Sequence, residues 1–563
     1  MKKPIFLFFM LIFSVVPQFV FAQVDSTTLN GSNITGTVTL NANTTYILKG
    51  FTRVKSGGVL VIYPGALILG DKSTTGTLIV ERGGKIYADG TVDKPITFTS
   101  RFPAGQRNPG DWGGIIILGR SGINTATGLD SAKIEGMPAG QDTYYGGQPV
   151  VQDDSSGVMR YVKIEFPGVN LTTVAGNEIN GLTMGGVGSR TVIEYVQVSY
   201  SGDDAFEFFG GTVNCKYLIA LGTVDDDLDC DNGHRGKIQF ALVVRDSAKY
   251  DVSDSHLFEI DNNSNNPSNY NSPRTRTIFS NITAIGPNVY GNPDFLRGAH
   301  LRRNMLASIF NTIMMAYPKG VRFDGPGVGN ACNGDTIRLR NNIFAGFTTA
   351  LADTAGGIGS SGFTNGTAWL QTASFSNRVY ANNSDVMLSN PFGIYPLPAP
   401  PANNVNNWVP NSGSPALTGA SFNDPLLAGF ENTTFVGAFG QTNWTADWAN
   451  FNPQQYTPTP IGVQQISEEV PGRFELSQNY PNPFNPSTGI NFSLPVSGFV
   501  TLKVYDAVGK EISILVNEIY QAGIYKLSFN ASNIPSGVYF YKITVNNTKS
   551  VEWTQTKKMI LVK

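Results

Sequence analysis

The sequence contains little cysteine and little charge. Its 563 residues include three cysteines, Cys215, Cys230 and Cys332, and this small, odd number excludes a disulfide framework. Their scarcity favours three small buried side chains, with a Cys215–Cys230 bridge as the alternative. Charged residues make up 15% of the chain, too few for a helical bundle or coiled coil, and the hydrophobic content of 41% is too high for a disordered chain. A net charge of -2 gives no electrostatic basis for binding nucleic acid.

Long apolar runs are also missing after the first residues. The chain begins "MKKPIFLFFMLIFSVVPQFVFAQ", in which Lys2 and Lys3 precede an apolar segment and a small-residue cleavage site falls between Ala22 and Gln23. This pattern is typical of a secretory signal peptide, residues 1–22, and is too short for a membrane span. No later stretch reaches the roughly 18 apolar residues of a transmembrane helix. We therefore expect an exported protein without a transmembrane segment.

Short strand patterns separated by glycine turns recur along most of the chain. Residues 60–70, "LVIYPGALILG", alternate apolar with other residues around a glycine turn. Residues 78–88, "LIVERGGKIYA", show the same pattern 18 residues later. Farther on, "RYVKIEFPG" (160–168), "EYVQVSYSG" (194–202) and "KYLIALGTV" (216–224) share one pattern. A loose period of about 20 to 30 residues is typical of a solenoid. Alternation of apolar and other residues without helical periodicity favours a parallel β-helix.

Residues 35–440 resemble right-handed parallel β-helix proteins. "GTVDKPITFTS" (90–100) and "GDWGGIIILGR" (110–120) look like stretches common in secreted bacterial members of this group. The resemblance implies the fold and leaves the activity open, because this fold hosts lyases, hydrolases and adhesins. The fold class expected is all-β, with a β-helix passenger over residues 23–451 followed by a small sandwich.

Irregular segments interrupt the period and follow it. Polar, turn-rich inserts at residues 167–178 and 262–277 are expected to project as loops from one rim of the solenoid. Residues 435–453, "FVGAFGQTNWTADWANFNP", are expected to cap the last coil. Trp444 and Trp448 fit such a hydrophobic cap better than the alternative, a platform for a sugar.

The segment "GTVDDDLDCDNGHRG" (222–236) crowds five aspartates into seven positions. Aligning the inward residues Leu182, Phe206, Leu228 and Phe258 of successive coils predicts columns of outward residues. One column holds Thr183, Glu207, Asp229, Glu259, His300 and Arg322, and a parallel column holds Phe209, Asp231, Asp261, Arg302 and Asp324. Just before these columns, Asp203 and Asp204 would lie beside Asp225 and Asp226.

Such a column would place like charges about 4.8 Å apart, which requires raised pKa values, neighbouring cations or a bound metal ion. Carboxylates at this spacing suit Ca²⁺, and its candidate ligands are Glu207, Asp229, Asp231 and Glu259. The candidate binding face as a whole comprises Asp203, Asp204, Glu207, Asp225, Asp226, Asp229, Asp231, Glu259, Asp261, His300, Arg302 and Arg322. The alternative is that these residues only solvate the surface and form turns.

A catalytic role for this face has weaker support. "GDD" (202–204) and "GHR" (233–235) faintly resemble two motifs of β-helix polygalacturonases, which cleave glycans with clustered aspartates. The Asn-Thr-Asp element of that family is missing, since this chain has "EINGLT" at residues 178–183. A calcium-dependent lyase would need a basic residue beside the metal, and Arg302 or Arg322 is available. The catalytic residues of either enzyme are not assigned.

The last part of the chain has a different composition. Residues 452–473 are polar and proline-marked, which predicts a linker. Residues 474–563 contain alternating strands such as "FVTLKVYDAVGKEI" and a turn at "PSG", typical of a small immunoglobulin-like antiparallel β-sandwich. This segment resembles the type A C-terminal sorting domain of the type IX secretion system through "QNYPNPFNPST", "YDAVGKE", "PSGVYFYKI" and the basic, apolar end "KKMILVK".

The resemblance of the tail implies partners and a location. Its partners would be the type IX translocon and its surface sortase, and the protein would be secreted or held on the outer membrane face of a Gram-negative bacterium. We expect the passenger to be a binding or adhesion protein with a Ca²⁺- or glycan-binding acidic face. A polysaccharide lyase or glycoside hydrolase using the same face, and a structural component of a surface layer, are the alternatives.

Overall fold

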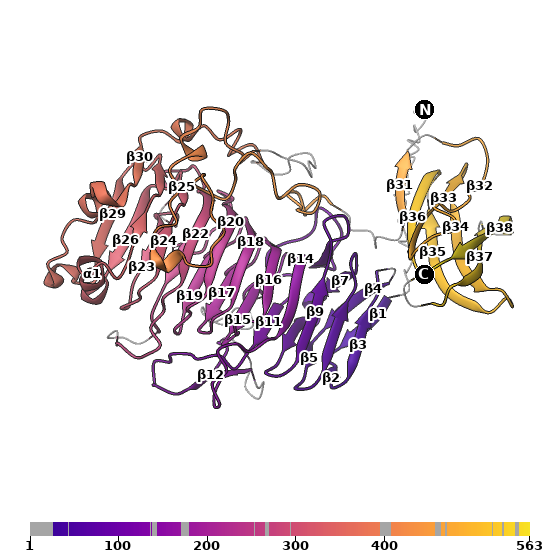
Figure 1. Ribbon diagram of the computed structural model, residues 1–563, viewed down its shortest axis with the longest axis horizontal. Helices are drawn as coiled ribbons and strands as arrows, with labels where there is room; N and C mark the ends of the chain where they lie inside the picture. The colour runs from indigo at the N-terminus through magenta and orange to yellow at the C-terminus, as the bar shows by residue number, and fades with distance from the viewer. Residues whose placement is uncertain are drawn as a thin grey trace, which may run out of the picture. The chain divides into compact units, whose positions relative to one another are not determined.

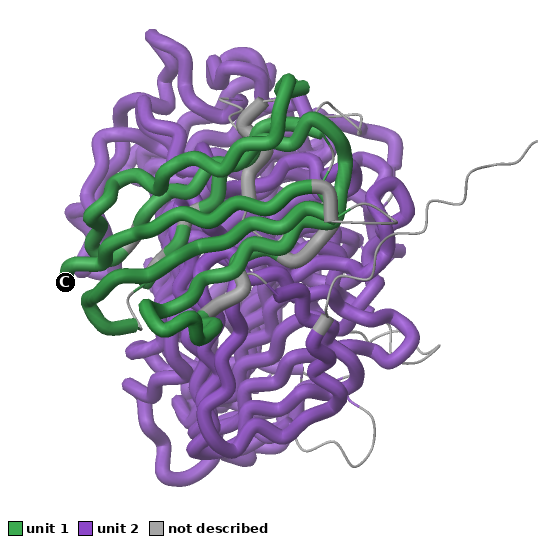
Figure 2. The backbone as a smooth tube through the Cα atoms, turned by 90° about the vertical axis from the view of Figure 1, so that its right-hand side faces the viewer, with its two compact units in different colours: residues 1–25, 463–563 green, residues 26–462 purple. Residues whose placement is uncertain are grey.

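The computed structural model describes most of the chain after residue 25. The described residues are 26–563 except 43, 136, 138–142, 170–178, 253, 265–268, 293, 395–406, 457–462, 468–469, 521, 532–533 and 547–550. The predicted signal peptide, with its cleavage site at Ala22 and Gln23, lies outside them. The chain divides into two compact units, residues 26–462 and residues 463–563, which Figure 2 colours separately.

The first unit is a parallel β-helix built from two long sheets, as predicted (Figure 1). The strands of sheet A are β1 (Ser26–Asn30), β3 (Thr37–Leu40), β4 (Thr45–Lys49), β6 (Val59–Ile62), β7 (Leu67–Gly70), β9 (Lys85–Asp89), β10 (Ile96–Ser100), β14 (Gly157–Glu165), β16 (Val192–Ser199), β18 (Asn214–Leu221), β20 (Lys237–Val244), β22 (Ile278–Ile285), β24 (Ser308–Phe310), β25 (Ile313–Met315), β27 (Leu339–Arg340), β28 (Ile343–Ala345) and β30 (Arg378–Tyr380). The strands of sheet B are β2 (Asn33–Ile34), β5 (Phe51–Val54), β8 (Thr77–Val80), β11 (Gly114–Leu118), β15 (Leu182–Gly185), β17 (Phe206–Phe209), β19 (Leu228–Asp231), β21 (Phe258–Ile260), β23 (Arg297–Leu301), β26 (Lys319–Asp324) and β29 (Ala350–Ala355).

The interior of the solenoid is apolar along its whole length. Inward residues of sheet B, such as Leu182, Phe206 and Leu228, are 0–1% exposed and meet inward residues of sheet A. Cys215 of β18 and Cys230 of β19 are two of these interior residues, and all three cysteines are free and buried. The small buried side chains that we predicted are therefore observed, and the alternative Cys215–Cys230 bridge is not.

The long middle strands of sheet A bend where one residue adopts a left-handed conformation. These residues, one per coil, are Tyr161, Tyr195, Tyr217, Phe240 and Asn281, with φ between 49° and 59°. Such a conformation costs an ordinary residue about 1–2 kcal/mol, and asparagine tolerates it best. The aromatic residues offset this cost by stacking, since the ring centroids of Tyr195 and Tyr217 lie 4.3 Å apart.

A long segment without strands, residues 408–456, lies along the outer face of sheet A, and we call it the strap (Figure 1). It runs back along the solenoid, because Gly419 bonds to Asn341, Gly437 to Asn311 and Asn450 to Gln197. Trp448 is 1% exposed and packs edge-on against Tyr161 and Tyr195, so it is no platform for a sugar.

The structure corrects the predicted cap over residues 435–453. These residues cover the side of the solenoid, because outward residues of sheet A such as Leu242 and Ile313 are apolar and require a cover. The C-terminal end of the interior is instead closed by α1 (Pro326–Asn333), η2 (Ile358–Ser361), α2 (Gly366–Leu370) and η3 (Ala373–Phe375). Val328, Phe363 and Leu370 of this helical segment belong to the interior cluster. None of the helices in the described part of the chain has the length and apolar character needed to span a bilayer.

The second unit is an antiparallel sandwich of two four-stranded sheets, as predicted. Its strands are β31 (Val463–Ser467), β32 (Glu475–Leu476), β33 (Ser487–Leu494), β34 (Gly498–Asp506), β35 (Glu511–Tyr520), β36 (Gly523–Asn530), β37 (Gly537–Asn546) and β38 (Val551–Leu561). The predicted linker, residues 452–473, is shorter in the structure at both ends. Asn452 to Tyr456 belong to the strap, and β31 pairs with β36.

Asn281 is the residue whose replacement tests how the strap is held. Its Nδ2 donates to Thr433 Oγ1 and to the carbonyls of Phe435 and Gly437 at 3.0–3.2 Å. Asn281→Ala leaves buried strap carbonyls unpaired, so we expect the free energy of unfolding to fall by about 2–4 kcal/mol. Chemical denaturation followed by circular dichroism measures this loss. The control is Asn288→Ala, since Asn288 has a similar φ of 54° but an exposed side chain; an equal loss in both variants would mean that the strap bonds contribute nothing.

Candidate functional site

Acidic residues of neighbouring coils line up on the outer face of sheet B. Glu207 of β17 is the register partner of Asp229 of β19, which in turn is the partner of Glu259 of β21. The same column begins with Thr183 and continues through His300 and Arg322, in the predicted order. It ends at a residue that sequence reasoning missed, Asp353 of β29.

The second predicted column lies two residues farther along each strand. Phe209 is the partner of Asp231, and Asp261 follows on the next coil, where its amide donates to the Cys230 carbonyl. Arg302 follows Asp261, since its Nε donates to Asp261 Oδ1 at 2.9 Å. The first predicted column is therefore present, and the second is present from Phe209 to Arg302.

A third row of polar side chains holds the turns that precede these strands. Asn180 Oδ1 accepts from the amide of Asp204 at 3.1 Å, and Asp204 Oδ1 accepts from the amide of Asp226 at 2.9 Å. Asp226 Oδ1 accepts in the same way from His256, on the next coil. Oδ1 of Asp204 and Oδ1 of Asp226 therefore each hold the backbone of the next coil in place. Sequence reasoning missed Asn180 and His256, although both stand at the same offset before an inward apolar residue.

Glu259 and Asp261 are neutralised by basic residues of the following coil. Arg302 bonds to Glu259 at 3.0 Å and to Asp261 at 2.9 Å, and Arg303 also binds Asp261 at 2.6 Å. Burial alone would raise the pKa of Glu259, but His300 and Arg302 lower it to about 2. Glu259 is therefore ionised and already paired.

The last coils of the column are compensated in the same way. His300 Nε2 lies 3.0 Å from Asp324 Oδ2, and Arg322 binds Asp353 through two nitrogens, at 2.8 and 3.0 Å. Arg322 is thus paired with Asp353 and does not neutralise the acids of β17 and β19.

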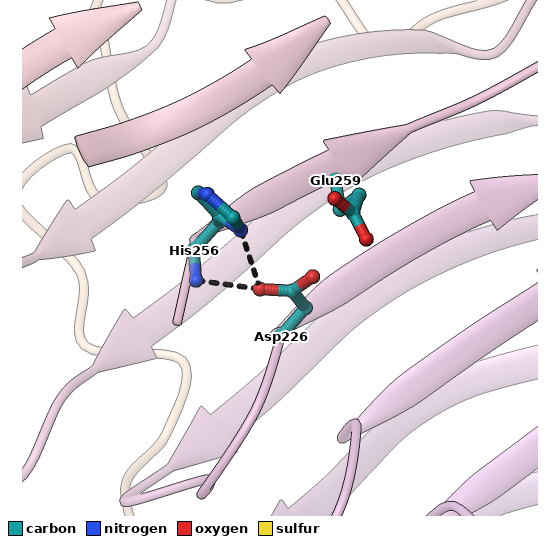
Figure 3. Close-up of side chains that lie close together, drawn as sticks. All are labelled: Asp226, His256 and Glu259. Carbon is teal, nitrogen blue, oxygen red and sulfur yellow. Dashed lines mark hydrogen bonds and ion pairs between the residues drawn. The ribbon is translucent and has the colours of Figure 1, made fainter. Parts of the chain in front are cut away.

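His256 acts as a buried cation in this cluster. Its Nδ1 lies 3.0 Å from Asp226 Oδ1, and its Nε2 lies 3.3 Å from Asp254 Oδ2; Figure 3 shows the imidazole facing Asp226, with Glu259 close by. Burial opposes its charge, but Asp226 and Asp254 outweigh burial and raise the pKa of His256 to about 10. With its two ring nitrogens facing Asp226 and Asp254, His256 forms an ionic cluster with them, and Glu259 lies beside it.

On the two preceding coils, burial and neighbouring acids act on Asp204, Glu207, Asp225 and Asp229 more strongly than any described cation does. Burial, followed by repulsion from neighbouring acids, raises the pKa values of Asp204, Glu207, Asp225 and Asp229 far above their usual range. Burial raises the pKa of Asp231 to about 8. Asp203 lies beside Asp204 and Asp225. We call these six residues, on or just before β17 and β19, the acidic half of the face.

Several polar atoms in the acidic half lack hydrogen-bond partners among the described residues. They are Asp225 Oδ1 and Asp229 Oδ1, and beside the acidic half the same holds for Thr183 Oγ1 on β15. Thr183 is 0% exposed and stands next to Glu207 in the column. A buried polar atom without a partner is costly, so these atoms favour a ligand that supplies one.

The acidic half has the geometry of a cation site. One ligand atom each from Asp204, Glu207 and Asp229 lies within 4.8 Å of the others, and the same holds for Asp203, Asp204 and Asp225. Two oxygens on opposite sides of one Ca²⁺, at about 2.4 Å each, would be about 4.8 Å apart. The structure thus groups Glu207 and Asp229 with Asp204. The other two predicted ligands are engaged elsewhere, since Glu259 pairs with Arg302 and Asp231 accepts from the amide of Asn232.

A hairpin inserted after β11 covers the neighbouring part of the face. It consists of β12 (Ser131–Lys133) and β13 (Tyr144–Gly146), and its Tyr145 stacks on Phe209 at 5.8 Å. Glu135, which follows β12, is close enough to Glu207 to contribute to its raised pKa. This hairpin lies outside the repeating strand pattern of the solenoid, which explains why alignment of the coils missed Glu135.

Two residues of the aspartate-rich segment lie inside the solenoid. Asp227 pairs with Arg245 at 2.8 Å, and both side chains are 0% exposed. His234 of the "GHR" motif is also 0% exposed, bonds to Thr277 and stacks on Phe208 at 4.6 Å. Since His234 lies in the core, the faint resemblance to a polygalacturonase motif does not extend to its position.

Comparison with known families agrees with this architecture. Residues 32–387 match the family described as pectate-lyase like beta helix domain, and residues 478–561 match the family described as secretion system C-terminal sorting domain. No curated protein and no solved structure matches the chain.

The raised pKa of Asp231 predicts a pH dependence of stability. Between its ordinary pKa of 3.8 and its native value of about 8, the folded protein holds a proton that the unfolded chain releases. The free energy of unfolding should therefore fall as pH rises from about 4 to 8, and Asp231→Asn should flatten this decline. Melting temperatures with a chelator present measure it.

Asp353→Asn is the matched control for this experiment. The pKa of Asp353 is lowered to about 2, so its contribution is lost only below its ordinary pKa of 3.8. The decline between pH 5 and pH 8 should be unchanged in this variant. A wild-type protein whose stability rises over that interval would contradict the raised pKa values.

Proposed function

The chain belongs to the pectate-lyase-like β-helix family, and we propose that its acidic half binds a divalent cation and, through this cation, an anionic glycan. Its sorting domain makes it a secreted or cell-surface protein of a Bacteroidetes-type bacterium, exported by the type IX secretion system. Contact with the translocon follows from the sorting domain. Processing by the surface sortase is part of the proposal.

The observation that carries the proposal is the uneven compensation of charge along one face. Glu259 and Asp261 are paired with Arg302, Arg303 and His300, whereas burial and then repulsion from neighbouring carboxylates raise the pKa values of Glu207 and Asp229 on β17 and β19. A cation bound between them would remove this repulsion and provide a partner for Asp229 Oδ1.

Ca²⁺ is the cation that fits the donors best. The candidate ligands Asp204, Glu207 and Asp229 offer only carboxylate oxygens, and the nearby hydroxyl is that of Thr183. Ca²⁺ takes six to eight oxygen ligands in flexible geometry, whereas zinc prefers nitrogen and sulfur. Three carboxylates leave coordination positions for water and for a carboxylate of the ligand.

The proposed ligand is an anionic glycan because cations continue the two columns beyond the acids. His300, Arg302 and Arg322 follow the acids on the next coils, and the Arg302 and Arg322 side chains are 26% and 25% exposed. A glycan carboxylate could therefore meet either the bound cation or a guanidinium, which recognises carboxylates well.

A second candidate function, cleavage of the glycan, is favoured by one pair of residues. Asp229 and Glu259 are register partners, yet the pKa of Asp229 is raised by burial whereas that of Glu259 is lowered to about 2. Adjacent carboxyl groups with separated pKa values suit the acid and base of a glycoside hydrolase. A purely structural surface-layer role is the outcome if neither binding nor cleavage is found.

The cation proposal predicts a calcium-dependent melting temperature. We expect Ca²⁺ to raise the melting temperature of residues 23–563, and Asp229→Asn to weaken calcium affinity by about tenfold or more. Isothermal titration calorimetry measures the affinity. Asp353→Asn, in the same column but paired with Arg322, should bind Ca²⁺ like the wild type. Unchanged affinity in Asp229→Asn would contradict the assigned ligands.

The second candidate is tested by incubating the protein with acidic polysaccharides. A hydrolase would release reducing ends and a lyase would form unsaturated ends. Asp229→Asn and Glu259→Gln should each lower such a rate by about a hundredfold or more, since both carboxyl groups would be needed. Glycan binding without any new chain ends would leave the binding role alone.

A further inference from the structure

The strap covers a pair of buried charged side chains on a face of sheet A that is largely apolar and carries a few polar residues bonded to the strap, such as Gln197 and Asn281. The outward residues of sheet A beneath it include Ile219, Leu242 and Ile313. On β14 the same face instead carries Lys163 and Glu165, which are 6% and 0% exposed. These two buried residues belong neither to the acidic face nor to the solenoid interior.

Asn450 of the strap lies directly over this pair. Its Nδ2 donates to Glu165 Oε1 at 2.8 Å. Its backbone amide donates to Gln197 Oε1 at 2.8 Å, and its carbonyl accepts from Gln197 Nε2 at 2.6 Å. Gln197 on β16 is the register partner of Lys163.

These contacts place Asn450 next to Lys163. Four residues of the paired strands β14 and β16 mark the corners of a rectangle: Lys163 and Glu165 on β14, and their respective partners Gln197 and Ser199 on β16. Its sides are about 4.8 and 6.6 Å, so its centre is about 4 Å from each corner in the plane of the sheet. Asn450 bonds to the side chains of Gln197 and Glu165 at opposite corners, and Lys163 occupies a third corner, so its long side chain can extend toward Asn450.

Lys163 has no opposite charge at bonding distance among the described residues. Its Nζ lies 5.5 Å from the ring centroid of Tyr456, and burial lowers its pKa. Glu165 Oε2 likewise lacks a hydrogen-bond partner in the described part of the chain. A buried ammonium without a paired anion is strongly unfavourable, which favours a neutral amine at this position.

We propose that Lys163 Nζ and Asn450 Cγ form an isopeptide bond that joins the strap to β14. The neutral amine attacks the side-chain amide carbon of Asn450. The amide of Asn452, 3.1 Å from Asn450 Oδ1, stabilises the negative charge that develops on that oxygen. Glu165 is already bonded to the leaving nitrogen, Asn450 Nδ2.

The reaction balances without an oxidant or cofactor. The Nζ–Cγ bond forms and the Cγ–Nδ2 bond breaks. Glu165 accepts a proton from Nζ and passes it to Nδ2, which leaves as ammonia. The product is a neutral amide, so the buried amine, whose charged form burial disfavours, is consumed. Because Lys163 and Asn450 are far apart in sequence, the bond would close most of the solenoid into one covalent ring.

Mass spectrometry of the purified chain, residues 23–563, tests the proposal directly. A cross-linked chain weighs one ammonia molecule less than its sequence requires. Trypsin should release a branched peptide that joins residues 161–190 to residues 379–473, because the modified Lys163 is no longer cleaved. Recovery of the separate peptides 161–163 and 164–190, with the unmodified mass, would overturn the proposal.

Variants distinguish the assigned roles. Lys163→Met and Asn450→Ala should abolish the branched peptide, and Glu165→Gln should abolish or greatly delay it in a chain with native circular dichroism. Lys216→Met is the control, because Lys216 also contacts the strap, at 3.7 Å from Glu431, but is not a member of the cross-link. Retention of the branched peptide in folded Glu165→Gln would overturn the role given to Glu165.

Discussion

The parallel register of one coil on the next is the constraint on which the rest of the structure depends. Each coil contributes one residue to every column, at a spacing of about 4.8 Å, so any residue type repeated at the same offset becomes a continuous row. Rows of apolar residues form the interior, a row of left-handed residues bends sheet A, and a row of acids forms the candidate site. A change at one offset therefore acts on its neighbours above and below before it acts on its neighbours in sequence.

Sequence reasoning predicted the features that follow from this register. The alternation around Phe206, Leu228 and Phe258 was sufficient to align Glu207, Asp229 and Glu259, because a strand has a period of two and glycine turns mark its ends. The sorting domain was recognisable from its motifs, and its strands are those expected.

Features that depend on distant segments had no local signal. The strap is held by bonds such as that between Gln197 and Asn450, which are 253 residues apart. Glu135 comes from an insert outside the period, and the pairing of Glu259 with Arg302 depends on the length of the loop between their coils. The sequence therefore predicted the alignment of Glu207 with Asp229, and it carried no signal for which acids are paired with basic residues of the protein.

The strap also sets a limit on how this solenoid can evolve. Repetitive folds usually gain or lose whole coils with little penalty, because each coil contacts only its neighbours. Here the strap is hydrogen-bonded to Asn341, Asn281, Gln197 and Arg107. The length of the strap therefore has to match the distance between the coils that carry these residues. An added coil would need a matching extension of the strap, and solenoid length and strap length should change together among descendants of this chain.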